Sequence, residues 1–219
     1  MTDTKICGIK TSEALEAAIA GGARWIGLVL HDKSPRNLTL QTAAALAEQA
    51  RGKVAIVVLL ADPGDDRLAD VVRAVGPHFI QLHGQESAER VAAIRAAFGT
   101  RIIKAVGVTS EDDVRAGLEY YKPGQVADLV LFDAKPPSGA KVPGGHGIAF
   151  DWQILSAVPV DTPYLLAGGL TPENVREAIG LTGAPAVDVS SGVETKPGEK
   201  STKLIGDFLQ AVKTAMETL

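Results

Sequence analysis

The chain has 219 residues, 46% of them hydrophobic, and its 26 acidic and 22 basic side chains give a formal net charge of −4. This length is typical of α/β barrels that fold as one domain, so we expect a single domain over residues 1–219. The apolar fraction excludes an intrinsically disordered chain. The acidic excess argues against a nucleic-acid partner, because proteins that bind nucleic acid usually carry a basic excess.

The cysteine content and the apolar runs indicate the compartment. The single cysteine, Cys7, cannot form an internal disulfide, which is typical of a reducing environment and argues against a cysteine-ligated metal cluster. The longest apolar run, residues 54–61, is far shorter than the roughly 20 residues that a bilayer helix requires. Residues 1–5 lack the apolar stretch of a signal peptide. We therefore expect a soluble, cytoplasmic protein with no membrane contact and, since no coiled coil or interface is indicated, a monomer.

Short β-branched runs alternate with alanine-rich helical windows along the whole chain. The runs are mostly apolar on both faces, which is typical of strands covered by helices. The predicted strands are Lys5–Ile9, Trp25–Leu30, Val54–Leu60, Phe79–Leu82, Ile102–Val106, Leu129–Asp133, Tyr164–Ala167 and Ala186–Val189. The predicted helices are Ser12–Ala20, Leu40–Ala50, Asp65–Val75, Ser87–Phe98, Glu111–Tyr120, Trp152–Ala157, Pro172–Ile179 and Thr202–Met216. Thr171 before Pro172 predicts an N-cap followed by proline at the first helical position.

Eight strand–helix units predict a parallel sheet with right-handed crossovers. Eight units in this length favour a closed (β/α)₈ barrel, the TIM barrel, over an open doubly wound sheet. An open sheet would be favoured by a glycine-rich turn after the first strand. That turn, residues 8–11, contains no G-x-G-x-x-G motif.

The connection after the sixth strand, residues 134–149, is out of scale with the others. A long loop is either a tolerated surface insertion or a functional lid or binding loop. Its expected position at the carboxyl end of the barrel favours the second interpretation.

Glycines follow the two last strands, at the barrel end where active sites form. Gly168 and Gly169 follow the seventh strand, and Ser191 and Gly192 follow Asp188 of the eighth. Taken singly, these segments read as a tight turn and a helix cap. Together they predict a phosphate site, because loops after strands seven and eight often bind phosphate through backbone N–H groups.

Cys7 and Asp133 are the candidates for proton transfer. The plain alternatives are a buried core cysteine and a solvated loop carboxylate. Strand alternation places Lys5, Cys7 and Ile9 on one face, and Leu131 and Asp133 on one face of another strand. Since strands one and six are not neighbours, Cys7 and Asp133 are expected to flank a substrate from opposite sides. That arrangement suits general acid–base catalysis.

Six sequence blocks match a known family in the same order. They are KICGIK at 5–10, KSPR at 33–36, QLHG at 81–84, GGxG at 144–147 with FDW at 150–152, LAGGL at 166–170 with PENV at 172–175, and DVSSGVE at 188–194 with PG at 197–198. On these blocks the chain resembles phosphoribosylanthranilate isomerase, a barrel enzyme of tryptophan biosynthesis. The first and last blocks are specific, whereas the Gly-Gly turns alone would not be.

The resemblance implies an Amadori rearrangement of N-(5-phosphoribosyl)anthranilate to 1-(2-carboxyphenylamino)-1-deoxyribulose 5-phosphate, without metal or organic cofactor. Asp133 matches the general acid that protonates the ribose ring oxygen, and Cys7 matches the base that removes the C2′ proton. Arg36 matches the residue that pairs with the anthranilate carboxylate, for which a planar bidentate guanidinium is well suited. Gly168, Gly169, Asp188, Ser191 and Gly192 complete the predicted substrate-binding set.

The thiol and two departures from the family pattern carry further expectations. A thiol base works better when positive charge lowers its pKa below about 8.5, and Lys5 and Lys10 are local sources of such charge. His146 stands where the family often has Thr or Ser, and is either a solvated loop residue or a titrating substrate contact. Ser201 replaces an Asp that is frequent in the family, and both residue types cap helices.

Gln81 and His83 lie on one face of the fourth predicted strand, so each inward polar group needs a hydrogen-bond partner. We expect them to support the mouth of the barrel rather than to act in catalysis. Two other functions remain open. The histidine-biosynthetic barrel isomerase has acidic residues at the ends of strands one and five, where this chain has Cys7 and no acid. A non-catalytic phosphate-binding barrel would be favoured by loss of Cys7, Arg36 or Asp133, and all three are present.

Overall fold

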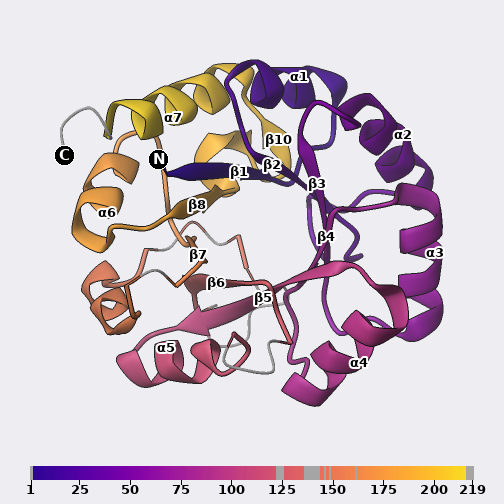
Figure 1. Cartoon of the computed structure of the whole chain (residues 1–219). Coiled ribbons are helices and arrows are strands. Elements are labelled where there is room, and N and C mark those ends of the chain that lie inside the picture. The colour runs from indigo at the N-terminus through magenta and orange to yellow at the C-terminus, as the bar shows by residue number, and fades with distance from the viewer. Residues whose placement is uncertain are drawn as a thin grey trace.

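The structure is a computed structural model that describes residues 2–121, 126–135, 144–145, 147, 149–160 and 162–215. Eight parallel strands pair in sequential order from β1 to β8 and close into a barrel (Figure 1). The strands are β1 (Asp3–Cys7), β2 (Trp25–Val29), β3 (Ala55–Leu60), β4 (Phe79–Leu82), β5 (Arg101–Val108), β6 (Leu129–Ala134), β7 (Tyr164–Leu166) and β8 (Ala186–Val189). The predicted (β/α)₈ barrel is therefore confirmed.

The helices form a ring outside the strands (Figure 1). They are α1 (Ser12–Ala20), α2 (Leu40–Ala50), α3 (Asp65–Val75), α4 (Ala88–Phe98), α5 (Glu111–Leu118), the 3₁₀ helix η1 (Trp152–Ala157), α6 (Val175–Thr182) and α7 (Thr202–Ala215). After β8 come the 3₁₀ turn η2 (Ser191–Val193) and a small hairpin of β9 (Glu194–Lys196) and β10 (Glu199–Lys200). None of the described helices is long and apolar enough to cross a membrane.

Many strand and helix boundaries differ from the sequence expectation by one to three residues, and two of these differences, at β1 and α6, have a clear physical reason. β1 ends at Cys7 because Gly8 adopts a left-handed φ of +82° that breaks the extended chain. Ile9 consequently packs in the core between barrel and helices, so the expectation that it shares a face with Cys7 is wrong. α6 begins at Val175 rather than Pro172, because residues 172–174 form a turn closed by the Thr171 N–H, which donates to Asn174 Oδ1 (2.8 Å).

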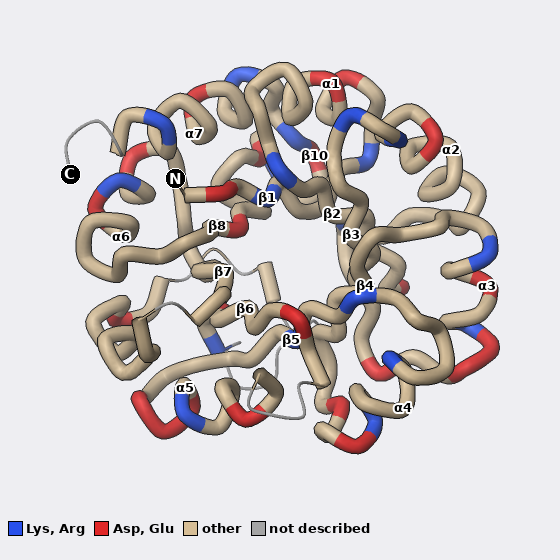
Figure 2. Tube along the Cα trace, in the orientation of Figure 1, with Lys and Arg blue, Asp and Glu red and all other residues tan. Residues whose placement is uncertain are grey.

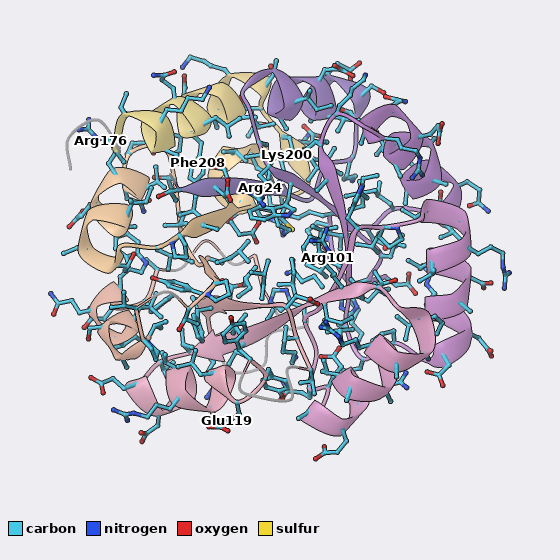
Figure 3. All side chains as sticks on the ribbon, in the orientation of Figure 1. Arg24, Arg101, Glu119, Arg176, Lys200 and Phe208 are labelled. Atoms are coloured by element: carbon cyan, nitrogen blue, oxygen red, sulfur yellow. The ribbon has the colours of Figure 1, made fainter. Side chains whose placement is uncertain are left out.

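The barrel is filled by side chains rather than open. Strand alternation sends one set of residues outward against the helices, where Phe208 of α7 is fully buried (Figure 3). The inward set forms a separate apolar cluster inside the barrel, and Cys7, Val29 and Leu59 form a smaller cluster. Most charged residues lie on the outer ring of helices (Figure 2), but Lys5 of β1 and Asp188 of β8 are buried.

Candidate active site

Two adjoining pockets lie at the carboxyl ends of the strands. The central pocket, of about 480 Å³, is lined by Cys7, Arg36, His83, Asp133, Asp188 and neighbouring residues. The glycine pocket, of about 430 Å³, is lined by Asp133, Gly168, Gly169, Asp188, Ser191 and neighbouring residues. Because Asp133 and Asp188 belong to both walls, the two pockets adjoin.

The structure brings most of the predicted site residues to these two walls. Gly192 does not line either pocket. A Cβ at Gly192 would collide with the backbone carbonyl of Leu170, so this glycine allows η2 to pack against the loop that follows β7. The predicted part of Gly192 in substrate binding stays a prediction.

The Cys7 thiol is buried beside an ion pair inside the barrel. Lys5 Nζ lies 2.9 Å from Asp188 Oδ1, and the side chains are 0% and 8% exposed. Gly27 of β2 leaves room for this group, since a Cβ there would lie 2.9 Å from Cys7 Sγ and 3.2 Å from Lys5 Nζ. The Cys7 thiol and the Lys5 ammonium therefore both pack against Gly27.

The charges around Cys7 oppose one another. Burial raises the pKa of the Cys7 thiol above its usual value and Asp188 raises it further, while Lys5 and Lys200 act in the lowering direction. The expectation of a lowered thiol pKa is therefore wrong, because desolvation outweighs the two ammonium groups. Burial also acts against the Lys5 ammonium, but the charges of Asp188 and Cys7 leave the pKa of Lys5 raised, so Lys5 stays cationic.

The second cation beside the thiol is Lys200 rather than Lys10. Lys10 Nζ is exposed and donates to Pro35 O at 3.1 Å. Lys200 of β10 lies beside β1 (Figure 3), and its Nζ donates to Ser190 O at 2.9 Å. Sequence reasoning missed Lys200 because its approach to Cys7 depends on the β9–β10 hairpin folding back over the barrel.

Arg36 is held by an acidic partner that the sequence reasoning did not assign. Its Nε and Nη2 donate to the two carboxylate oxygens of Glu194 at 2.7 and 2.8 Å, and Lys200 Nζ lies 2.6 Å from the same carboxylate. Burial acts against ionisation of Glu194, yet the hydrogen bonds from Arg36 and Lys200 leave its pKa lowered. Gly145 lies against the other edge of the guanidinium, because Arg36 Nη2 also donates to Gly145 O at 3.4 Å and a Cβ at Gly145 would lie 2.5 Å from Nη1. Among the described residues Arg36 Nη1 donates to no acceptor, so its N–H groups are the ones left for a ligand carboxylate.

Asp133 ends β6 and faces His83. Its Oδ1 accepts the N–H of Ala134 at 2.8 Å, and its Oδ2 lies 3.5 Å from His83 Nε2. Gln81 Nε2 lies 3.2 Å from His83 Nδ1, so the expected contact between Gln81 and His83 is confirmed. Asp133 and Cys7 both line the central pocket.

The glycine pocket is shaped by left-handed backbone. Gly168 and Gly169 have φ values of +86° and +66°, which side chains other than glycine rarely adopt. A Cβ at Gly168 would lie 2.7 Å from the Ala134 nitrogen, so the loop after β7 touches the end of β6. Asn174 Nδ2 donates to Gly169 O at 2.9 Å and holds this loop against the start of α6.

Part of the long loop lies outside the described residues, including His146 and residues 136–143. The lid expectation and both interpretations of His146 therefore stay predictions. The described glycines of this loop line the site: Gly144 and Gly145 the central pocket, and Gly145 and Gly147 the glycine pocket. Ser201, the other departure, accepts the Leu204 N–H at 3.2 Å at the start of α7, as expected of a helix cap.

Solved structures show the same architecture. Phosphoribosyl anthranilate isomerase from Thermotoga maritima superposes with a TM-score of 0.86 at 33% identity, covering 98% of this chain and all of the other. A phosphoribosyl anthranilate isomerase in complex with reduced 1-(o-carboxyphenylamino)-1-deoxyribulose 5-phosphate superposes with a TM-score of 0.81 at 32% identity, with coverage of 98% and 100%.

Sequence comparison agrees with the structural comparison. The chain is 47% identical over 215 residues to N-(5'-phosphoribosyl)anthranilate isomerase of Rhodopseudomonas palustris (strain HaA2), covering 98% of this chain and 97% of the relative. It is 45% identical over 213 residues to the Brucella canis protein of the same name, with coverage of 97% and 95%. The family model for N-(5'-phosphoribosyl)anthranilate (PRA) isomerase matches residues 4–211. The chain therefore belongs to the N-(5'-phosphoribosyl)anthranilate isomerase family.

Proposed function

We propose that the chain catalyses the Amadori rearrangement of N-(5-phosphoribosyl)anthranilate to 1-(2-carboxyphenylamino)-1-deoxyribulose 5-phosphate in tryptophan biosynthesis. The observation that carries the proposal is that Cys7 and Asp133 line one pocket, which adjoins a glycine-lined pocket suited to phosphate. A solved relative with an analogue of this product bound supports the same substrate class.

Asp133 gives its proton to the ribose ring oxygen, and the furanose opens to a protonated Schiff base. Cys7, as thiolate, then removes the C2′ proton to give an enolamine, which tautomerises to the ketone. The Lys5 ammonium beside Cys7 and the nearby Lys200 stabilise the thiolate that this step requires. Each step moves a proton, so the proposal assigns no metal or organic cofactor.

The two pockets divide the substrate between them. Val29 and Leu59 give the central pocket an apolar wall beside Cys7, which suits the anthranilate ring. Arg36 Nη1 binds the ring carboxylate, with the guanidinium held in place by Glu194. The 5′-phosphate takes the glycine pocket, where Gly168, Gly169 and Ser191 offer backbone and hydroxyl donors.

Complementation tests the reaction and its specificity. The gene should restore growth of a tryptophan auxotroph that lacks this isomerase and should not restore a histidine auxotroph that lacks the histidine-biosynthetic barrel isomerase. Growth of the histidine auxotroph alone would contradict the proposed substrate. Failure in both strains, with the protein expressed and folded, would favour a non-catalytic phosphate-binding barrel.

Two substitutions test the assigned acid and base. We expect Cys7→Ser and Asp133→Asn each to lower kcat by about 10²- to 10⁴-fold, the usual contribution of a positioned acid or base. The thermal midpoint should change little, because both replacements are nearly isosteric. Near-normal turnover in either variant would refute its assignment.

Organisation of the protein in the cell is part of the same proposal. We infer one domain over residues 1–219, a monomer, a location in the cytoplasm, and no partner besides the small phosphoribosyl substrate. Among the described residues the exposed large hydrophobic side chains are Val160 and Leu181, which is little apolar surface for a stable dimer. Sedimentation over a range of concentrations tests the monomer.

A further inference from the structure

His83 stands between two polar side chains at the mouth of the barrel. On one side, Gln81 Nε2 lies 3.2 Å from its Nδ1, and on the other Asp133 Oδ2 lies 3.5 Å from its Nε2. Gln81 is 0% exposed. The ring therefore connects a buried amide with the carboxyl group to which the acid step is assigned.

The Gln81 amide leaves one polar atom unused. Its Oε1 is buried and has no hydrogen-bond partner among the described residues. A buried oxygen without a donor destabilises the folded state, so a conformation that satisfies it is favoured. Rotating the amide by half a turn would place Oε1, instead of Nε2, opposite His83 Nδ1.

Each orientation of the amide selects one tautomer of neutral His83. When Gln81 Nε2 donates to Nδ1, the ring proton is on Nε2, which then donates toward Asp133 and suits a carboxylate. When Gln81 Oε1 accepts from Nδ1–H, Nε2 is a bare acceptor, and it suits an Asp133 that carries a proton. The same three side chains thus fit both protonation states of Asp133.

We propose that Gln81 and His83 are positioning residues for Asp133, and that the Gln81 amide rotates and His83 changes tautomer as Asp133 alternates between acid and carboxylate. This inference rests on the proposed function, in which Asp133 starts each turnover protonated and ends it ionised. The ring keeps one proton throughout: it leaves Nδ1 for water while a proton from water binds Nε2. Asp133 later regains its proton as Cys7 loses the one taken from C2′.

The surroundings hold Asp133 in one orientation while its charge changes. The Ala134 N–H binds Oδ1, so it is Oδ2 that exchanges the proton and faces His83. Gly144 packs directly over the pair, since a Cβ there would lie 2.7 Å from Asp133 Oδ2 and 2.9 Å from His83 Nε2. Among the described residues, the other titratable or charged groups that share pocket walls with Asp133 or His83 are Cys7, His31, Arg36, Lys104, Asp113, Tyr120, Lys135 and Asp188.

Nitrogen-15 NMR of labelled histidine tests the tautomer without any activity measurement. The chain has four histidines, and the His83 signals are those missing from His83→Gln. At neutral pH we expect the wild-type His83 ring to carry its proton on Nε2, the tautomer that accepts from Gln81 Nε2 at Nδ1. In Asp133→Asn the Ala134 N–H keeps the amide oxygen in the Oδ1 position, so the amide N–H₂ faces His83 and should move the ring proton to Nδ1. The same tautomer in both proteins would overturn the proposal.

Gln81→Glu tests the amide itself. A carboxylate can only accept from Nδ1, so we expect His83 to carry protons on both nitrogens while Asp133 is ionised. An imidazolium beside Asp133 lowers the pKa of that carboxyl group. The basic limb of the kcat/KM profile, along which the acid form of Asp133 is lost, should therefore shift to lower pH. Gln81→Met has nearly the same shape, donates no hydrogen bond and accepts only weakly, so it is the control and should not produce the doubly protonated ring. An unprotonated Nδ1 in Gln81→Glu would contradict the rotation.

Kinetics separate positioning from a purely structural role. We expect His83→Leu to lower kcat by about 10- to 100-fold, to shift the basic side of the pH profile, and to leave KM nearly unchanged. His83→Gln keeps a donor and an acceptor near Asp133 and should recover most of this loss. If the two variants are equally impaired with an unshifted profile, His83 only supports the fold. If the wild type itself is inactive, the proposed function fails, and the NMR result still decides the tautomer.

Discussion

Lys5 and Asp188 form a buried ion pair, 2.9 Å from Nζ to Oδ1, next to the single cysteine of the chain. The two charges act on the Cys7 thiol in opposite directions: Lys5 favours the thiolate and Asp188 disfavours it. The pair also holds Lys5 as an ammonium in a barrel interior where burial would otherwise remove its proton. Asp188 therefore keeps Lys5 positively charged beside Cys7, but the negative charge of Asp188 itself disfavours the Cys7 thiolate.

Removing one member of this pair should move thiol ionisation in a direction that depends on which member is removed. We expect Lys5→Met to raise the pKa of Cys7 further and Asp188→Asn to lower it. Alkylation rate against pH measures this directly, because Cys7 is the only thiol. Both variants should lose about 3–5 kcal/mol of unfolding free energy, the usual cost of an unpaired buried charge. Since the stability effects share a sign, opposite thiol shifts cannot arise from loosening of the fold, and shifts of equal sign would contradict the assignment.

Substitution of Gly27 tests how strictly the position of the Cys7 thiol is fixed. A Cβ at this position would lie 2.9 Å from Cys7 Sγ and 3.0 Å from Cys7 Cα, so Gly27→Ala must displace the thiol or the strand. We expect kcat to fall by at least about 10-fold, because small misplacements of a reacting group are costly. Gly180→Ala is the matched control, since a Cβ there meets no atom within 4 Å. Equal turnover in both variants would show that the Cys7 position tolerates movement.

Strand count and periodicity predicted the barrel because each strand is a short apolar run bounded by turn residues. The end of β1 depends on a single backbone angle, because the φ of +82° at Gly8 ends the strand before Ile9. The pattern of apolar residues contains no information about this angle. The start of α6 was misplaced for a related reason. Thr171-Pro172 reads as a helix start, and Thr171 Oγ1 does accept the Glu173 N–H at 3.3 Å, but the α-helix itself begins only at Val175, after a turn in which Asn174 Oδ1 accepts the Thr171 N–H.

For the site, strand ends indicated which residues meet at the mouth, and motif order indicated their roles. The partners that set the electrostatics were not predictable in the same way. Glu194 and Lys200 reach Arg36 and Cys7 only because the β9–β10 hairpin folds over the barrel. The raised pKa of Cys7 was missed because the depth of burial, which outweighs the nearby cations, is a property of the packed fold.

Glu194 should make stability depend on pH in the acid range. Its folded-state pKa is lowered below 4.5, so ionised Glu194 contributes stability that is present above about pH 4.5 and lost as the pH falls through the folded value. We expect the unfolding free energy of Glu194→Gln to be lower at neutral pH and to fall less steeply below pH 4.5 than that of the wild type. Urea unfolding between about pH 3 and pH 7, roughly the range over which a carboxyl group titrates, measures the unfolding free energy of both proteins as a function of pH. Parallel curves would show that the Glu194 carboxylate is not the group that titrates.

Arg36→Lys should separate the two tasks of the guanidinium. A lysine offers a point charge in place of the planar fork, so it cannot hold both Glu194 oxygens and still present a free edge to the substrate carboxylate. We expect KM to rise by about 10- to 100-fold, corresponding to the loss of about 1.5–3 kcal/mol from one charged hydrogen bond, while kcat changes much less. Arg24→Lys is the matched control, because Arg24 is 60% exposed, pairs with Asp3, and lies outside both pockets. A fall in kcat with KM unchanged would mean that Arg36 acts on the reacting groups and not on the anthranilate carboxylate.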